Sequence, residues 1–409
     1  MSESTLIKAA RLFDGISGRL AEDRYVVIRG DAITDIGRTA DLGASAVQQF
    51  GATIELQPQQ TLMPGLINMH THLSFSSGPN VFEDQVNETD AIKMVRIVEN
   101  LHAALDVGIT TVRDCGTWPH LALPARDAVE GGMLRGPRMV TSGAITSTGG
   151  HCWFCAIEAD NEDELRKAVR THVKDGVDFI KLFATGGNTT PGSNSLVAQY
   201  TEAQMCAATE EARKAGRRSA SHAHAIEGVR TSIKARVTTI EHCSFQLDDG
   251  FGWDDDMVKE ILDNDIYVCP TVFRGLAKLI GDPNHHFTAR EEMFLSRRKD
   301  RFRLTRRLAD IGVKLVSGND SGVAHCHITD YPGDLVETVT ECGISPAAVL
   351  RSATSVAAEA LGRADLGVLA PGKAADLLVL EGDPLTDIHA LEHPALVIAR
   401  GRKQPFTVI

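Results

Sequence analysis

Two patterns of apolar and polar residues divide this chain. Before about residue 60, short apolar runs such as residues 25–29 and 32–36 lie between Gly15, Gly30 and Gly37. Short runs bounded by glycine are typical of β-hairpins. Similar runs return at residues 376–380 and 395–400. We therefore predict a small β-sandwich domain that is built from residues 1–60 together with residues 366–409.

The middle of the chain, residues 61–365, has a different pattern of apolar and polar residues. Apolar runs of a strand's length alternate with amphipathic segments such as residues 90–101 and 202–213, an alternation that predicts β-α-β units around a parallel sheet. The strand candidates end at His70 or span residues 110–113, 138–141, 179–182, 219–222, 238–242, 267–269 and 314–317. This set predicts an α/β fold of the (β/α)₈ TIM-barrel type. An open doubly wound sheet would favour a glycine-rich phosphate loop after its first strand, and none follows here.

Composition and charge narrow the possible partners. The 409 residues are 43% hydrophobic and 23% charged, as in ordinary globular proteins. The net charge of −12, without a Lys/Arg-rich block, argues against nucleic acid and anionic membrane as partners. No targeting pattern opens the sequence and no apolar stretch reaches about 18 residues, so a cytoplasmic location is expected.

Cysteine usage adds little to this prediction. The eight cysteines are scattered along the chain, which does not suggest a disulfide framework. The pair Cys152 and Cys155 has C-x-x-C spacing, but two cysteines supply too few ligands for a structural zinc site.

Residues that can bind metals follow several of the predicted strands. His70 and His72 lie two positions apart, so on a strand both imidazoles point to the same side and could share one cation. Further candidates at or just after later strand ends are Lys181, His222, His224, His242 and Asp320. Because the carboxyl ends of all strands in a (β/α)₈ barrel open onto one face, these side chains are expected to converge there.

The combination resembles the amidohydrolase superfamily, from the Pro-Gly-Leu-Ile-Asn-Met-His-Thr-His run at residues 64–72 to the run at residues 367–380. Thr185-Gly-Gly and the 20-residue step from His222 to His242 are similar to its binuclear-metal dipeptidase and carboxypeptidase branch, which includes prolidase-like and ochratoxinase-like enzymes. The resemblance implies two divalent metal ions, with zinc as the first choice. It assigns the inner ion to His70, His72 and Asp320, the outer ion to His222 and His242, and a bridging carbamate to Lys181.

The chemistry of lysine agrees with this implied role. An ammonium group has no lone pair and would be repelled by two cations, whereas a neutral amine can take up carbon dioxide and become a bidentate anion. The alternative is a surface lysine whose ammonium reaches solvent along an apolar stem.

The predicted function is hydrolysis of an amide C–N bond in a small molecule. A hydroxide bridging the two ions would attack the carbonyl carbon, and Asp320 would carry the proton to the departing amine. The expected substrate is a dipeptide, either Xaa-Pro or one with a hydrophobic C-terminal residue, or an N-acyl amino acid such as an ochratoxin-type amide. His151 and His224 are expected to contact it, and a homo-oligomer is expected.

Some residues depart from the branch or have a second interpretation. His151 is followed by the apolar-flanked C-x-x-C, and no tyrosine follows His224 where several relatives use one near a substrate carboxylate. Arg274 and Lys278 could bind such a carboxylate instead, or belong to a solvated loop. His325 and His327 either line the mouth of the site or lie in solvent, and His285 and His286 are expected to be exposed.

Three other functions remain open. An aryl amide, carbamate or urea hydrolase would use the same two ions. A one-metal deaminase of the superfamily would use His224 as a ligand and Glu227, in H-x-x-E spacing, as a proton shuttle. A catalytically silent scaffold is disfavoured because every ligand position holds a competent residue.

Overall fold

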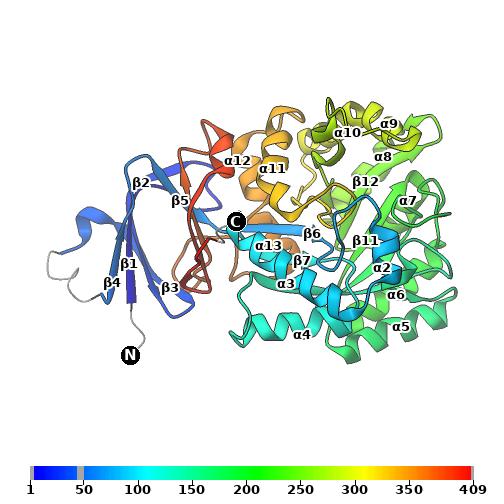
Figure 1. Ribbon diagram of the computed structural model, residues 1–409, viewed down its shortest axis with the longest axis horizontal. Helices are drawn as coiled ribbons and strands as arrows, with labels where there is room; N and C mark the ends of the chain where they lie inside the picture. Colours follow the sequence, from blue (N-terminus) through cyan, green and yellow to red (C-terminus); the bar gives the residue numbers. More distant parts are fainter. Residues whose placement is uncertain (1–3, 44–49, 407–409) are drawn as a thin grey trace.

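The computed structural model describes residues 4–43 and 50–406. Residues 1–3, 44–49 and 407–409 of the segments predicted to form the small β domain lie outside these ranges. It is a mixed α/β fold with two sheets, one at the left and one at the centre of the helix-covered body in Figure 1. Within the described ranges, no helix is both long and apolar enough to cross a bilayer.

The smaller sheet takes strands from both ends of the chain. Its eight strands are β1 (Ser4–Phe13), β2 (Leu20–Arg29), β3 (Ala32–Arg38), β4 (Ala52–Glu55), β5 (Gln60–Pro64), β15 (Leu377–Glu381), β16 (Pro394–Ala399) and β17 (Arg402–Lys403). β5 lies between β1 and β15, so it joins the N-terminal strands to the C-terminal ones. Ile7, Val26, Leu62, Leu377 and Ile398 share a buried apolar cluster on this sheet.

The larger sheet is mainly parallel. Its strands are β6 (Leu66–Thr71), β7 (Ile109–Asp114), β8 (Arg138–Thr146), β9 (Ile157–Glu158), β10 (Phe179–Phe183), β11 (Arg218–Ala225), β12 (Thr239–Leu247), β13 (Gly250–Phe251) and β14 (Tyr267–Cys269). The parallel pairs run β6-β7-β8-β10-β11-β12-β14, which is the order of the sequence. Sequential parallel neighbours require a crossover between each pair, and a helix supplies most of these.

The two edges of this curled sheet meet at residues 314–321. Val268 of β14 exchanges backbone hydrogen bonds with residues 314 and 316, while Met69 of β6 donates to Ser317 O at 2.9 Å and Asp320 donates to His70 O at 2.9 Å. The predicted strand at residues 314–317 is nevertheless wrong as a regular strand, because Leu315 forms only an isolated bridge there. The segment changes partner from β14 to β6 within three residues, so it has no continuous ladder with either.

Helices lie along the outside of the curled sheet (Figure 1). The α-helices of the described residues are α2 (Val81–Asn87), α3 (Asp90–Asp106), α4 (Pro119–Glu130), α5 (Glu162–Asp175), α6 (Glu202–Lys214), α7 (Ile226–Lys234), α8 (Asp255–Asp263), α9 (Ala289–Ser296), α10 (Arg298–Ile311), α11 (Tyr331–Thr340), α12 (Pro346–Ser352) and α13 (Ser355–Leu361). Short 3₁₀ helices span Thr39–Asp41, Trp153–Cys155, Gly275–Leu279, Ile328–Asp330 and Ile388–Glu392.

The packing of α5 shows how the sequence places one site strand. The Asn161 side chain accepts a hydrogen bond from the Glu164 backbone at 3.0 Å at the start of α5, and Gly176, with φ of +95°, ends the helix. Val169 of α5 packs into the same core as Ile180 of β10. The alternation along β10 then turns its neighbour Lys181 to the opposite face, toward the inside of the curled sheet.

Candidate metal centre

The candidate ligands come from separate strands and meet at the carboxyl ends of the parallel strands. His70 is in β6, with His72 just beyond it, and Lys181 is in β10. His222 and His224 are in β11, His242 is in β12, and Asp320 follows the segment that joins β14 to β6. The structure therefore brings together the residues that the sequence analysis selected from distant positions.

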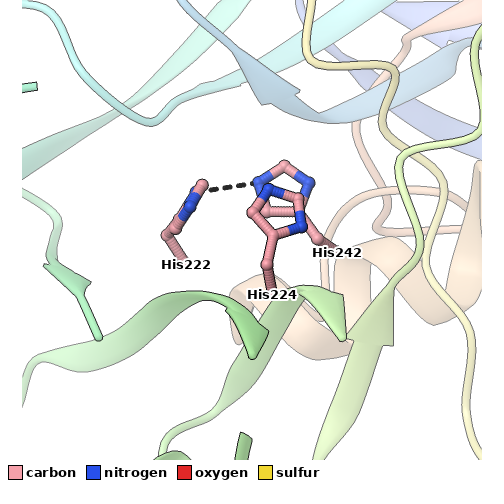
Figure 2. A group of neighbouring side chains, drawn as sticks. All are labelled: His222, His224 and His242. Atoms are coloured by element: carbon pink, nitrogen blue, oxygen red, sulfur yellow. Dashed lines mark hydrogen bonds between the residues drawn. The ribbon is translucent and has the colours of Figure 1, made fainter. Parts of the chain in front are cut away.

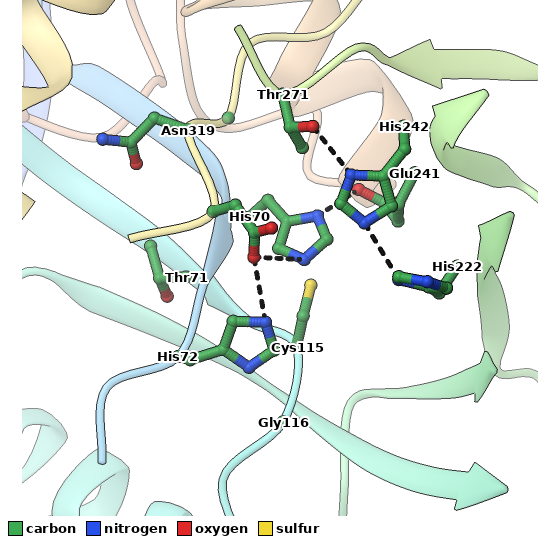
Figure 3. Close-up of polar contacts among 12 residues, drawn as sticks. His70, Thr71, His72, Cys115, Gly116, His222, Glu241, His242, Thr271 and Asn319 are labelled. Carbon is green, nitrogen blue, oxygen red and sulfur yellow. Dashed lines mark hydrogen bonds and ion pairs between the residues drawn. The ribbon is translucent and has the colours of Figure 1, made fainter. Parts of the chain in front are cut away.

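One cluster is formed by His70, His72 and Asp320. The Oδ1 atom of Asp320 lies 3.3 Å from His70 Nε2 and 3.1 Å from His72 Nε2. Figure 3 shows the two imidazoles turned toward this common point. Gly318 permits the approach of the Asp320 segment, since a Cβ atom there would lie 2.6 Å from the His70 backbone nitrogen.

A second cluster is formed by His222, His224 and His242. Each offers a ring nitrogen within 4.8 Å of the others, and His222 Nδ1 lies 2.9 Å from His242 Nε2 (Figure 2). His222 Nε2 donates to the carbonyl oxygen of Gly186 at 3.1 Å, so in the neutral ring Nδ1 carries a lone pair. His242 Nδ1 bonds the Thr271 hydroxyl at 2.8 Å, which orients Nε2 toward His222.

Lys181 is fully buried, with 0% of its surface exposed, and its Nζ atom has no hydrogen-bond partner among the described residues. The alternative of a surface lysine is therefore wrong. A buried amine without a partner is costly, so some further group must compensate it. A positive charge on Lys181 lowers the pKa values of both His70 and His242, which indicates that Lys181 lies near both clusters.

Burial lowers the pKa values of four of these imidazoles and so favours their neutral forms. It lowers the pKa of His70 to about 4 and that of His224 to about 3, and it lowers the pKa values of His222 and His242 as well. Burial alone would raise the pKa of Asp320, but His70 and His72 hold it below its usual range. Neutral imidazoles and an ionised carboxylate are the forms that bind metal.

A buried ion pair behind His70 was missed by the sequence analysis. His70 Nδ1 donates to Glu241 Oε2 at 2.9 Å, and Arg113 Nη2 donates to Glu241 Oε1 at 2.6 Å. The carboxylate thus fixes the proton on Nδ1 and leaves Nε2 free to face Asp320, an arrangement typical of metal-bound histidine. The available signal was an acidic residue directly before His242 within a predicted strand.

The backbone is strained at two of the candidate ligands. His242 has φ of +67° and Asp320 has φ of +62°, a left-handed conformation that side chains other than glycine rarely adopt. Such strain persists only where the surroundings enforce it and is concentrated at functional sites.

The donor set fits divalent cations. Each cluster supplies imidazole nitrogens, one cluster adds a carboxylate, and the unpartnered Lys181 amine lies near both. Imidazole and carboxylate together suit zinc and other first-row divalent ions.

A cavity of about 510 Å³ opens onto these clusters. Its wall includes His222, His242, Asp320, and the two histidines expected to contact substrate, His151 and His224. The His151 ring lies 4.7 Å from the His222 ring, and its Nδ1 atom has no partner among the described residues. His224 Nδ1 bonds the Ser244 hydroxyl at 2.9 Å.

Other residues singled out from the sequence lie outside this cavity. Arg274 pairs with Glu392 at 3.2 Å, and Lys278 pairs with Asp330, so neither is placed to bind a substrate carboxylate. Glu227 is exposed and pairs with Arg230, which leaves the deaminase alternative without its proton shuttle. His327 is exposed.

The structure also places five further histidines and cysteines that the sequence analysis considered. His325 lines the cavity. The prediction of an exposed His285 is wrong: its ring packs 5.4 Å from that of His325 and it is partly buried, whereas His286 is exposed. Cys152 and Cys155 are both free and buried in an apolar cluster with Phe75.

Known proteins resemble this chain along most of its length. The model of the amidohydrolase family matches residues 61–403. Ochratoxinase of Aspergillus niger is 26% identical over 431 aligned residues, which cover 96% of this chain and 84% of the relative. A solved Xaa-Pro dipeptidase with methionine bound in its active site gives a TM-score of 0.86 at 28% identity, covering 98% of this chain and 99% of that one. A prolidase complexed with N-methylphosphonate-L-proline gives 0.85 at 28%, covering 99% and 100%.

Proposed function

The chain belongs to the amidohydrolase family, and on that premise we propose that it hydrolyses the amide C–N bond of a dipeptide or an N-acyl amino acid. The chain is a hydrolytic enzyme. We propose which bond it cleaves and in which substrates. The relatives described as a Xaa-Pro dipeptidase, a prolidase and an ochratoxinase support this choice.

The observation that carries the proposal is the buried, unpartnered amine of Lys181 near two clusters of metal-binding side chains. His70, His72 and Asp320 would hold one divalent cation, zinc as the first choice, and His222 and His242 would hold the second. Lys181, carboxylated by carbon dioxide, would bridge the two. Divalent cations at such a centre polarise the substrate carbonyl and lower the pKa of water.

The chain's own residues would then perform the proton transfers. The ionised carboxylate of Asp320 faces the cavity, so it can accept the proton of the attacking water and deliver it to the amine nitrogen as the C–N bond breaks. His151 and His224 would hold the substrate, since both line the same cavity.

We also propose how the two sheets correspond to the two predicted domains. The curled sheet would be the closed (β/α)₈ barrel of residues 61–365, and the sheet of both chain ends would form the β-sandwich domain of residues 1–60 and 366–409. Assembly as a homo-oligomer and a cytoplasmic location stay predictions.

A hydrolysis screen of the zinc-loaded enzyme tests the proposed substrate class. The panel contains Xaa-Pro and other dipeptides, N-acyl amino acids, and aryl amides, carbamates and ureas. Preference for the first two groups by about tenfold or more in kcat/KM would support the proposal, a difference of about 1.4 kcal/mol in transition-state binding. Preference for the uncharged aryl compounds would contradict it in favour of the aryl amide or urea alternative.

A further inference from the structure

Arg301 of α10 lines the cavity beside the candidate metal centre, on the same wall region as Phe294. Its Nη2 atom donates to Pro270 O at 3.1 Å and contacts Thr271 Oγ1 at 3.5 Å. Thr271 in turn bonds His242 Nδ1 at 2.8 Å. The guanidinium is therefore separated from a candidate metal ligand by one hydroxyl group.

Among the described residues, Arg301 lacks a counter-ion of the kind that two other shielded arginines of this chain, Arg113 and Arg138, have. Arg113 pairs with Glu241 at 2.6 Å and Arg138 pairs with Asp376 at 2.6 Å. Across residues 4–43 and 50–406, no carboxylate forms an ion pair with Arg301, and its two bonds use one nitrogen only. Its Nε and Nη1 donors therefore have no hydrogen-bond partner among the described residues, and Arg301 lines the cavity.

The carboxylates of the cavity wall do not replace that counter-ion. Asp320 contacts His70 and His72, as described above. Glu291 accepts hydrogen bonds from the backbone and hydroxyl of Thr288, and Glu83 is exposed. Burial lowers the pKa of Arg301, and the charge of Asp320 opposes this shift from a distance.

A guanidinium in this position needs an anion to compensate its charge. Arginine stays charged inside proteins, and Arg301 is partly buried, so its charge is held partly away from water without an ion-pair partner, which is unfavourable. Its planar fork matches a carboxylate, which can accept two parallel hydrogen bonds. A carboxylate entering the cavity would satisfy the free donors of Arg301.

The surroundings of Arg301 also describe the neighbouring part of a ligand. The guanidinium carbon lies 5.6 Å from the centre of the Phe294 ring, which lies 5.5 Å from the Phe273 ring. Leu276 and Met293 line the same cavity. The pocket beside the cation is therefore apolar and aromatic, and it suits a hydrophobic side chain on the residue that carries the carboxylate.

We propose that Arg301 binds the free α-carboxylate of the amino acid that leaves, so that the substrate is an N-acyl amino acid or dipeptide with a hydrophobic C-terminal residue. This inference rests on the proposed function, because it places the carboxylate on the amine side of the bond to be cleaved. It assigns the anchoring role to a residue of α10.

Matched substrates separate carboxylate binding from other roles of Arg301. The pair is N-acetyl-L-phenylalanine and its C-terminal primary amide, which differ only in the carboxylate. The variants are Arg301→Gln and Arg301→Lys, with Arg303→Gln as the control because Arg303 is on the same helix and 78% exposed. Thermal unfolding of each variant checks that it folds.

We expect Arg301→Gln to raise KM for N-acetyl-L-phenylalanine by about 10- to 100-fold, the range for hydrogen bonds to a charged group, and to leave the amide almost unchanged. Arg301→Lys should recover part of the loss, and Arg303→Gln should have no effect. Equal losses on both substrates would overturn the proposal, because they would mean that Arg301 acts through Thr271 on His242.

Binding of free L-phenylalanine, measured by calorimetry, keeps this result separate from the proposed function. If the unmodified enzyme binds L-phenylalanine and Arg301→Gln weakens this binding about tenfold or more, the carboxylate site stands. This holds even when neither N-acetyl-L-phenylalanine nor its C-terminal primary amide is hydrolysed. If both N-acetylated substrates are hydrolysed and Arg301→Gln changes neither the binding of L-phenylalanine nor the KM of either substrate, the proposed function stands and the carboxylate site is wrong.

Discussion

The Nδ1 atom of His222 and the Nε2 atom of His242 face each other at 2.9 Å across the end of the parallel sheet. The other nitrogen of each ring already has a partner, Gly186 O for His222 and the Thr271 hydroxyl for His242. Burial lowers both pKa values, so neither ring is held as a cation. Two neutral rings whose remaining nitrogens converge form half of a metal site.

Removing either of these rings should remove one cation. We expect His222→Asn and His242→Asn to lower the bound metal from about two equivalents to about one and to lower kcat by about 100-fold or more, since each metal ion contributes several kcal/mol to the transition state. Elemental analysis after zinc loading measures the first effect. His120→Asn, an exposed ring that pairs with Asp90, is the control. Two equivalents retained by both variants would contradict the assignment.

Lys181 should carry a carbamate. Protein loaded with zinc in ¹³C-labelled bicarbonate is expected to give a carbamate carbon signal in NMR that Lys181→Met removes, because only a deprotonated, metal-facing amine is stabilised in that form. Lys181→Met should also bind zinc more weakly. The matched control is Lys93→Met, since Lys93 is also buried but lies on α3. A signal that survives in Lys181→Met would assign the carbamate elsewhere.

Glu241 should stabilise both the fold and the metal centre. Glu241→Gln leaves Arg113 buried without an anion, so we expect the free energy of unfolding of the metal-free protein to fall by about 3 kcal/mol. The weaker hold on His70 should lower zinc affinity by about 10- to 100-fold. Urea unfolding and competition with a chelator measure the two effects.

Asp376→Asn provides the comparison for Glu241→Gln. It breaks the ion pair between Arg138 and Asp376. Like the pair of Arg113 and Glu241, this pair is shielded from solvent, but it lies next to the smaller sheet. This variant should lose stability while its zinc affinity is unchanged. Equal zinc affinity in both variants would show that Glu241 does not orient His70.

The metal-free protein should lose stability as the pH falls below about 6.5. The folded pKa values of His70 and His224, about 4 and about 3, are lower than the ordinary value of 6.5, so the unfolded chain binds more protons in this range. Stability is therefore complete above pH 6.5 and declines toward pH 4, by about 1 to 2 kcal/mol for each histidine at pH 5.5.

Thermal unfolding of chelator-treated protein at pH 7.5 and pH 5.5 measures this decline. Carboxyl groups with ordinary or lowered pKa values change little between these two pH values. Burial raises the pKa of Asp334 to about 8, so its protonation stabilises the fold as the pH falls and opposes the histidine effect. Comparison with a histidine variant therefore isolates the histidine share. His224→Gln should reduce the pH dependence, and His120→Gln should not, because His120 is exposed. A pH dependence of the melting temperature that is equal in His224→Gln and in the unmodified protein would contradict the assigned direction of the His224 shift.

Local sequence determined the elements and the ligand types. The apolar run that ends at Lys181 predicted a buried strand, and β10 spans Phe179–Phe183. Two-residue spacing predicted that His70 and His72 share a side, and both contact Asp320. These predictions work because strand periodicity and side-chain chemistry depend on neighbouring residues alone.

Tertiary structure alone decided the partners. Arg274 and Arg301 are both arginines that follow β14. Arg274 pairs with Glu392 from the far end of the chain, whereas Arg301 has no carboxylate partner in the part of the chain that the structure describes. Likewise, the pairing of Glu241 with Arg113 and the change of partner along residues 314–321 depend on which strands become neighbours. Charge pairing and burial are set by distances between residues far apart in the sequence, and those distances exist only after the sheet has curled.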